Sequence, residues 1–358
     1  MRRNNMRKMV RTTGGALLVG KMPRGCELCV KGAKMVLFVT GLCRKKCYYC
    51  PLSERRRGKD IVYANERPVR TVKEILDEAR LMDALGTGIT GGDPVLRMKK
   101  TVNFIRAIKR RFGTKHHIHM YCGSEPSRVQ LIELKNAGLD EIRFHTWSEG
   151  PVRAAVSVGL NAGVEIPAIP GHEDRIKELI KRLETVGCSF LNLNELEFSD
   201  TNLESLRGMG FRLKSDESMA VKGSEMTAKK VLRWAESGTV ISVYYCPSSL
   251  KDSVQLRNRL KRRARNVMKR HEVMTGEGLI FKGIVADTAG ENVLTVRKEI
   301  MRRYDIPPEL IFLDRQKGRV ELHWAVAKKI APLEKKFRFA LIEEYPTWDR
   351  LETTFLPL

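Results

Sequence analysis

The feature that most constrains the fold is an alternation of short apolar runs with longer amphipathic runs, which extends from Lys34 to about Pro247. The short runs are rich in β-branched residues and have the length of strands, whereas the longer runs repeat apolar residues at helical spacing. This alternation predicts strand–helix units that build a parallel sheet. The expected strands are 35–40, 88–90, 117–122, 141–145, 164–169, 190–196 and 240–245.

Two helices of this region have clear boundary signals. Thr71 and Glu74 form a capping box, which predicts a helix over 72–85. Asp93 is a favourable N-cap before Pro94, and Gly113 is a favourable residue to end the helix that follows. Both helices lie between expected strands, as the alternation requires.

A different pattern begins after Cys246. The run 253–271 has an apolar stripe and no acidic residue, so we expect a long basic helix. Beyond it, 278–286, 291–304, 309–314, 318–323, 324–335 and 336–344 have the order strand, helix, strand, strand, helix, strand, which suggests a ferredoxin-like domain. The sequence therefore predicts an α/β fold in four parts: a basic N-terminal extension (1–33), the parallel α/β region (34–248), a basic linker helix (249–275) and a smaller C-terminal α+β domain (276–358).

Three cysteines, Cys43, Cys47 and Cys50, follow the first expected strand on one short loop. Thiolates at this spacing can bind three irons of a 4Fe-4S cluster and leave the fourth iron without a protein ligand. S-adenosylmethionine (SAM) can bind that iron through its amino and carboxylate groups, which places its sulfonium beside the cluster for reductive cleavage. The alternative is structural zinc, which normally takes four protein ligands where this loop offers three.

The spacing CxxxCxxC after a first strand resembles the signature of the radical SAM superfamily. The stretches 26–29, 32–34, 36–41 and 50–53 are similar to an archaeal branch related to pyruvate formate-lyase activating enzymes. The resemblance covers about residues 30–247. It implies a partial (β/α)6 barrel, a 4Fe-4S cluster, SAM as cofactor and a low-potential electron donor as partner.

The resemblance also implies cofactor-binding residues. Tyr49 takes the place of the aromatic residue that contacts the adenine in this family. Gly91, Gly92 and Asp93 take the place of a glycine-rich turn that holds the SAM amino group, although the family has a longer Glu where this chain has Asp93. Tyr49 could instead only pack beside the cluster, and Asp93 could also serve as a helix N-cap.

Polar residues interrupt several of the expected strands. Asn192 and Asn194 alternate on one face of a strand, so they either reach the SAM adenosine or line the barrel interior. His145, Arg143 and Glu195 are weaker candidates of the same kind. A histidine cluster, His116, His117 and His119, has no metal-ligating partner at suitable spacing, and we interpret it as polar packing or a pocket wall.

Cys26 and Cys29 form a CxxC pair upstream of the cluster loop, and Cys246 ends the last strand of the parallel region. These three thiols could bind a second metal. The alternative is that they are reduced cysteines packed at a domain junction.

Charge suggests a macromolecular substrate. The chain has 66 Lys and Arg against 42 Asp and Glu, a formal net charge of +24, which attracts polyanions. Candidate nucleic-acid-binding residues on the basic helix are Arg257, Arg259, Lys261, Arg262, Arg263 and Arg265. Two enzymatic functions compete, modification of RNA such as tRNA and activation or modification of a protein. A third possibility, from another class, is an RNA-binding protein without catalytic activity whose fold is stabilised by a bound metal.

The expected location is cytoplasmic, without a membrane partner. Five of the eight cysteines lie in one short stretch, as in a metal-binding protein of a reducing compartment. No run approaches the roughly 20 apolar residues of a membrane span.

Overall fold

The computed structural model describes residues 7–358, apart from the side chain of Asp252. The chain divides into two compact units. The first unit extends to Arg80 and continues over 84–256, and the second comprises 81–83 and 257–358. Among the described residues, no helix is long and apolar enough to cross a membrane.

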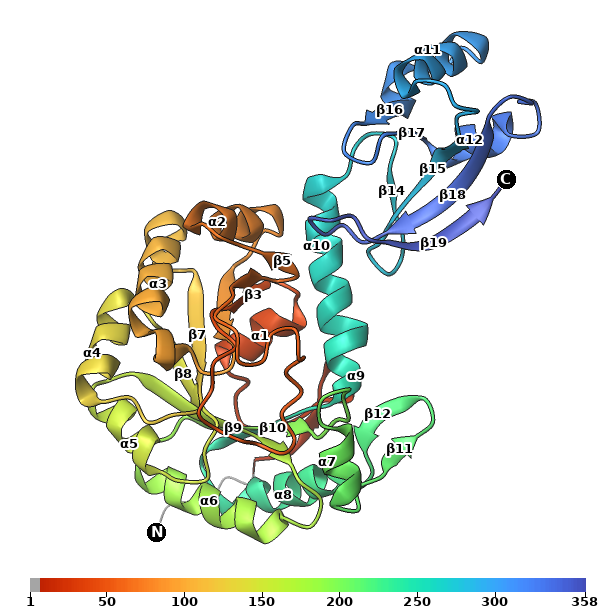
Figure 1. The fold of residues 1–358 in the computed structure, drawn as a ribbon. Helices are drawn as coiled ribbons and strands as arrows, with labels where there is room; N and C mark the ends of the chain where they lie inside the picture. The colour runs from red at the N-terminus through yellow and green to blue at the C-terminus, as the bar shows by residue number, and fades with distance from the viewer. Residues whose placement is uncertain (1–6) are drawn as a thin grey trace. The chain divides into compact units, whose positions relative to one another are not determined.

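A curved parallel sheet forms the centre of the first unit (Figure 1). Its parallel strands are β3 (Lys34–Phe38), β6 (Gly86–Thr90), β7 (His117–Cys122), β8 (Glu141–Phe144), β9 (Asn161–Ala168), β10 (Phe190–Glu195) and β13 (Ser242–Cys246). Helices cover its outer face: α2 (Val72–Leu81), α3 (Met98–Phe112), α4 (Arg128–Ala137), α5 (Gly150–Ser157), α6 (Glu173–Thr185) and α8 (Ser224–Gly238). The prediction of a partial α/β barrel is confirmed, and each of the seven expected strands, including that over 240–245, corresponds to one of these parallel strands.

The helix signals of the sequence are confirmed in detail. The backbone amide of Thr71 donates to Glu74 Oε2 at 2.9 Å, while the amide of Glu74 donates to the Thr71 hydroxyl at 3.3 Å. Helix α3 ends at Gly113, which has a φ of 78°. Helix α2 is shorter than expected and ends at Leu81, because Asp83 adopts a φ of 48° that a right-handed helix does not allow.

Two strands of the basic N-terminal extension join the main sheet. Strand β1 (Val10–Arg11) pairs with β2 (Leu17–Val19), and β2 pairs antiparallel with β13. Because β2 pairs with β13, it covers an edge of β13 that would otherwise be open. The three apolar side chains of β2 are buried. Helix α1 (Arg24–Val30) follows and lies inside the arc of the barrel strands (Figure 1).

Short elements complete the first unit. They are η1 (Thr13–Gly15), β4 (Tyr63–Ala64), β5 (Arg67–Pro68), η2 (Pro94–Arg97), α7 (Leu203–Gly208), β11 (Leu213–Ser215), β12 (Ser218–Val221), α9 (Ser248–Leu250) and the π-helix η3 (Lys251–Leu256). Helix α10 (Arg257–Val267) continues directly from η3. The basic helix therefore ends earlier than the expected linker over 249–275.

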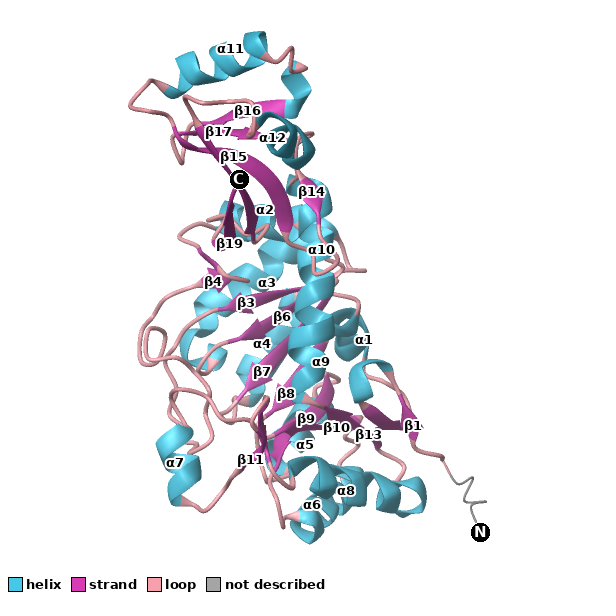
Figure 2. Cartoon of the chain, turned by 90° about the vertical axis from the view of Figure 1, so that its right-hand side faces the viewer, coloured by secondary structure: helices cyan, strands magenta, loops and turns pink. Residues whose placement is uncertain are grey.

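The second unit contains an antiparallel sheet in the order β16-β17-β15-β18-β19. Figure 2 shows β15, β16 and β17 of this sheet together with α11 and α12. Its elements are β14 (Val273–Met274), β15 (Ile280–Asp287), α11 (Val293–Arg303), η4 (Pro308–Leu310), β16 (Ile311–Asp314), β17 (Arg319–Leu322), α12 (Trp324–Ile330), β18 (Arg338–Glu344) and β19 (Glu352–Pro357). Strand β17 lies between β15 and β16, which is the split β-α-β order of a ferredoxin-like domain. The C-terminal prediction is confirmed, and β19 is an additional edge strand.

Candidate active site

The three cysteines of the cluster motif lie on a loop after β3 that its own backbone holds in place. The amide of Gly41 donates to the carbonyl of Lys59 at 2.7 Å, and the amide of Gly58 donates to the carbonyl of Gly41 at 2.9 Å. A Cβ atom on Gly41 would lie 1.7 Å from the carbonyl oxygen of Arg56, so this position requires glycine. The two ends of the loop are therefore fixed relative to each other.

The glycine-rich turn after β6 packs directly against the start of this loop. The amide of Gly92 donates to the carbonyl of Thr40, and the amide of Asp93 donates to the carbonyl of Leu42, both at 2.7 Å. A Cβ atom on Gly92 would lie 2.3 Å from the carbonyl oxygen of Leu42. The turn and the cluster loop are thus braced together at the carboxyl ends of two neighbouring parallel strands, where active sites of such barrels lie.

Asp93 is buried, and protein groups satisfy its carboxylate. One oxygen accepts hydrogen bonds from the backbone amide and hydroxyl of Ser124, at 2.7 and 2.6 Å, and the other accepts from the amide of Val95 at 3.2 Å. The helix N-cap role is therefore confirmed. The carboxylate is engaged with the loop after β7, so it positions the glycine turn instead of facing the cavity.

A cavity of about 370 Å³ opens at this place. Among the residues that line it are Cys43, Cys47, Cys50, Tyr49, Gly91, Gly92, Asn194 and Glu195. Thiolates are the ligands that iron–sulfur clusters take, and three of them face one space beside a turn that has no side chains. The residues present therefore fit a cluster with an adjoining ligand.

Tyr49 is held at the cavity by a short chain of hydrogen bonds. Its hydroxyl lies 2.7 Å from His145 Nε2, and His145 Nδ1 lies 3.0 Å from the carbonyl oxygen of Glu165. Nδ1 must donate to that carbonyl, so Nε2 accepts from the Tyr49 hydroxyl. Burial lowers the pKa of His145, which favours this neutral imidazole. The ring of Tyr49 is therefore fixed beside the cysteines.

The two asparagines of β10 meet at one carboxylate. Asn192 and Asn194 each donate to an oxygen of Glu165 at 2.9 Å, and the guanidinium of Arg143 donates to the same group at 2.9 Å. Asn194 lines the cluster cavity, whereas Asn192 lies farther inside the barrel and does not line that cavity. The structure therefore brings only Asn194 to the place where SAM is expected.

A second cavity, of about 380 Å³, occupies the barrel interior. Inward-facing residues of all seven parallel strands line it, among them Lys34, Gly88, His119, Arg143, Glu165, Asn192 and Tyr244. Burial, with a contribution from Arg143, lowers the pKa of Lys34 to about 8. Bulky apolar side chains usually fill the interior of a parallel barrel. This interior is polar and partly open instead.

The CxxC pair and Cys246 lie at this second cavity. Cys26 and Cys29 come from α1, and Cys246 is the last residue of β13. The structure thus brings together the three thiols that the sequence singled out, at a place separate from Cys43, Cys47 and Cys50.

Several residues that line these cavities were not singled out from the sequence. Glu165 was visible as one acidic residue in an otherwise apolar strand, and Lys34 as a charged residue at the start of another. Lys251 and Gln255 lie on η3 and offered no local signal, because their place depends on how the chain folds back after β13.

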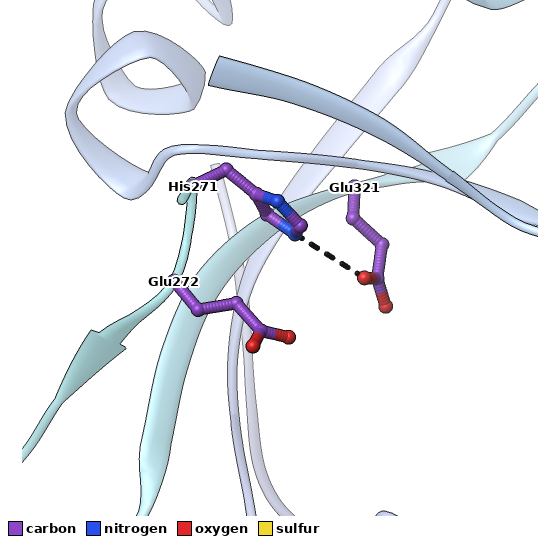
Figure 3. Close-up of side chains that lie close together, drawn as sticks. All are labelled: His271, Glu272 and Glu321. Atoms are coloured by element: carbon purple, nitrogen blue, oxygen red, sulfur yellow. Dashed lines mark hydrogen bonds and ion pairs between the residues drawn. The ribbon is translucent and has the colours of Figure 1, made fainter. Parts of the chain in front are cut away.

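The second unit contains a buried group of three residues that could ligate a metal, His271, Glu272 and Glu321 (Figure 3). The ammonium of Lys282 already lies among the carboxylates, 3.0 Å from Glu272 and 2.7 Å from both Glu321 and Glu344. Burial alone would lower the pKa of Lys282, but the three carboxylates raise it above its ordinary value. The ammonium of Lys282 therefore occupies the position that a metal ion would take among these carboxylates.

The basic helix does not present one continuous row of free cations. Arg263 is buried and its Nε donates to the carbonyl of Pro346 at 2.5 Å, while Arg262 Nε donates to the carbonyl of Met82 at 3.1 Å. Arg257 lies 3.6 Å from Glu277, and Arg265 is exposed. Two of the six candidate nucleic-acid-binding residues, Arg262 and Arg263, thus donate to backbone carbonyls of the protein itself.

Sequence comparisons agree with the geometry of the cluster loop. Residues 37–146 match the family described as "Radical SAM superfamily", and residues 278–358 match "Domain of unknown function (DUF8061)". A protein of Methanocaldococcus jannaschii, "Putative glycyl-radical enzyme activating enzyme MJ0021", is 41% identical over 359 residues, which cover 94% of this chain and 93% of that protein.

Among solved structures, methylornithine synthase (PylB) matches with a TM-score of 0.43 and 14% identity, over 62% of this chain and 71% of that chain. The radical SAM family match and the full-length relative together confirm the resemblance that the cysteine motif suggested. The chain therefore belongs to the radical SAM superfamily, is an enzyme with a 4Fe-4S cluster and SAM as its cofactors, and is related to the activating enzymes of that superfamily.

Proposed function

We propose that this enzyme abstracts a hydrogen atom from the α-carbon of a glycine residue in a partner protein and leaves a glycyl radical there. The cavity that Cys43, Cys47, Cys50 and the glycine turn share carries the proposal for the radical chemistry. The name of the 41% identical relative supports glycine as the substrate.

When bound, the cluster and SAM supply a 5′-deoxyadenosyl radical by one-electron reductive cleavage of a carbon–sulfur bond, with methionine as the other product. We assign the cluster to Cys43, Cys47 and Cys50, which leaves one iron for SAM. The backbone of Gly91 and Gly92 accommodates the amino acid part of SAM, and Tyr49 and Asn194 contact its adenosine. These residues hold the reacting carbon in place and keep water out, while the hydrogen atom comes from the substrate.

The electron comes from a low-potential donor that binds near the cluster loop. A surface hollow of about 800 Å³ adjoins this loop, and Arg44, Lys45, Lys46 and Arg57 are among the residues that line it. These cations favour an acidic protein as the electron donor, because opposite charges steer the encounter of two proteins.

Modification of RNA is the second candidate function. Exposed cations on and after the basic helix, Arg265 and Arg270, and the net charge of +24 support a polyanionic substrate. Because Arg262 and Arg263 donate to backbone carbonyls, the helix supports RNA less than its sequence suggests.

One experiment separates the two substrates. The reconstituted enzyme, SAM and dithionite are mixed anaerobically with extract from a strain that lacks the gene, and electron paramagnetic resonance is recorded. A glycyl radical has one α-hydrogen, so we expect a doublet signal that protease removes and ribonuclease leaves unchanged. The Cys43→Ala variant is the control and should give no doublet. If ribonuclease-sensitive material alone increases 5′-deoxyadenosine formation and no doublet appears, the protein substrate is refuted in favour of RNA.

A further inference from the structure

The barrel interior contains three thiols that the proposed radical chemistry does not use. Cys26 and Cys246 are buried and Cys29 is partly exposed, and all three line the interior cavity of about 380 Å³. Cys26 and Cys29 are three positions apart on α1, a spacing that places both side chains on the same face of a helix. Cys246 lies at the carboxyl end of β13.

Side-chain amides connect these thiols across the cavity. Gln255 places its Oε1 3.2 Å from Cys29 Sγ and its Nε2 3.8 Å from Cys246 Sγ, so one amide group spans the space between two sulfurs. Asn192 Nδ2 lies 3.3 Å from Cys26 Sγ. Gln255 belongs to the π-helix η3, a type of distortion that often marks functional sites.

Among the described residues, three buried polar atoms at this cavity have no hydrogen-bond partner: the donors Arg143 Nη2 and the Tyr244 hydroxyl, and the acceptor Asn192 Oδ1. Arg143 is 2% exposed and Tyr244 is 1% exposed, so bulk solvent does not cover these donors. A buried donor without a partner costs about 1–3 kcal/mol, which native proteins seldom tolerate twice in one place. Both donors indicate an acceptor that occupies the cavity in the functional protein.

We infer that Cys26, Cys29 and Cys246 bind a second iron–sulfur cluster inside the barrel. The sulfides of such a cluster accept hydrogen bonds, and hydrogen bonds to sulfur are one means by which proteins stabilise it. Burial raises the pKa of Cys26, and the guanidinium of Arg143 and the ammonium of Lys34, which line the same cavity, offset part of this cost of a thiolate. The amide of Gln255 would leave its place between the sulfurs when the cluster binds.

The spacing of the sulfurs favours a cluster over a single zinc ion. Zinc–sulfur bonds of about 2.3 Å place the sulfurs of one tetrahedral site about 3.8 Å apart. In the described part of the chain, the only group whose ligand atoms all lie within 4.8 Å of one another is His271, Glu272 and Glu321. Neither the three thiols of the barrel interior nor Cys43, Cys47 and Cys50 meet this limit. A cubane does not require its thiolates around one metal ion, because it distributes them over three irons.

The second centre would adjoin the SAM cavity. Five residues line both cavities, Thr90, Tyr121, Glu165, Asn194 and Lys251. All of them belong to the first unit, so the site does not depend on the second unit.

The test uses a variant that lacks the first cluster. Full-length protein with Cys43→Ala, Cys47→Ala and Cys50→Ala is reconstituted anaerobically with ferrous iron and sulfide, and its iron, sulfide and zinc are measured. We expect about four irons and four sulfides per folded chain, as one 4Fe-4S cluster requires. Adding Cys26→Ser, Cys29→Ser and Cys246→Ser should remove both. Adding Cys188→Ser should leave them, since that buried thiol lies elsewhere and contacts only backbone carbonyls of neighbouring strands.

Folding of each variant is checked by circular dichroism. If the triple variant does not fold, Cys26→Ser alone in the wild-type chain should lower iron from about eight to about four per chain, while Cys188→Ser leaves it at about eight. Iron that does not fall in the Cys26→Ser protein, a folded triple variant without iron, or zinc without sulfide would each overturn the second cluster. These readouts require neither SAM nor a substrate, so failure here is distinguishable from failure of the proposed radical reaction.

Discussion

Asn194 donates through its side-chain amide to the carboxylate of Glu165 at 2.9 Å, and the two residues line both the cluster cavity and the barrel interior. Glu165 also accepts from Arg143 and from Asn192. The two cavities are therefore separated by the Glu165 carboxylate, which forms an ion pair with Arg143 and accepts hydrogen bonds from the two asparagines. Burial alone would raise the pKa of Glu165, but Arg143 and the two asparagines lower it, which keeps this carboxylate ionised.

We predict that Glu165→Gln strongly destabilises the first unit. The substitution leaves the buried guanidinium of Arg143 with one carboxylate partner, Glu141, in place of two. Breaking a buried pair in this way typically costs about 3–5 kcal/mol. Denaturant unfolding of the full chain measures the loss, and Glu217→Gln, at an exposed position, is the matched control. Equal stability of the two variants would show that the ion pair of Glu165 and Arg143 does not stabilise the first unit.

Asp93 should affect catalysis through the glycine turn. We predict that Asp93→Ala lowers the rate of 5′-deoxyadenosine formation by about tenfold to a hundredfold, because small misplacement of a bound reactant has effects of this size. Ser124→Ala removes one of the three hydrogen bonds to Asp93 and should lower the rate less. Ser127→Ala, which removes the N-cap of α4 and makes no contact with the turn, should leave the rate unchanged. An unchanged rate in Asp93→Ala would contradict the positioning role of this carboxylate.

Lys282 should stabilise the second unit in a pH-dependent way. Lys282→Met removes the ammonium that pairs with all three buried carboxylates, while Arg319 and Arg350 keep their ion pairs with them, so we expect a cost of about 3 kcal/mol at pH 7. Burial alone would raise the pKa of Glu321, but His271 and Lys282 hold it far below its usual range. Its contribution to stability is therefore present above the unfolded pKa of about 4.3 and is lost as the pH falls toward the folded pKa.

The stability difference between Lys282→Met and the wild type should therefore shrink as the pH is lowered below about 4.3, where carboxylates without the lysine take up protons. Unfolding monitored at several pH values checks this, with Lys328→Met at an exposed position as control. A difference that stays constant down to pH 3 would contradict the electrostatic explanation.

The RNA candidate has its own test at the exposed cations. If RNA binds there, Arg265→Glu combined with Arg270→Glu should weaken tRNA binding and reduce the salt dependence of log Kd by about 2, one unit for each lost phosphate contact. Lys328→Glu with Lys329→Glu, two exposed cations of α12, should change neither value. Binding curves at several salt concentrations give the answer, and equal effects of the two double variants would exclude a specific RNA site on the helix.

The parallel strands and the cysteine loop were predictable because their signals are local. Apolar runs fix the strands, and Cys43, Cys47 and Cys50 lie within eight consecutive positions. What the sequence alone could not reveal depends on partners far along the chain. Ser124 is 31 positions from Asp93, and Pro346 is 83 positions from Arg263. Side chains that looked available for a ligand therefore proved to be bound by the protein itself.

Strand β2 was also not predicted from the sequence, because its formation depends on backbone pairing with a strand that is distant in the chain. Leu17–Val19 is too short to be recognised as a strand, and it becomes one because the edge of β13 offers hydrogen bonds and an apolar surface. In contrast, the meeting of Cys26 and Cys29 with Cys246 was anticipated, because a CxxC pair and a cysteine at the end of a barrel strand are both placed by local structure.

The most direct test of the account is 5′-deoxyadenosine formation by the anaerobically reconstituted enzyme with SAM and dithionite. Wild-type protein should form 5′-deoxyadenosine and methionine in a ratio of about one to one, and the Cys188→Ala variant should form as much of each product as the wild type. Cys43→Ala, Cys47→Ala and Cys50→Ala should each form none above the rate without protein, because two thiolates hold a cubane poorly. The product is measured by chromatography beside the wild type. If any one of these three variants forms as much 5′-deoxyadenosine as the wild type, the assignment of the cluster to this loop is contradicted.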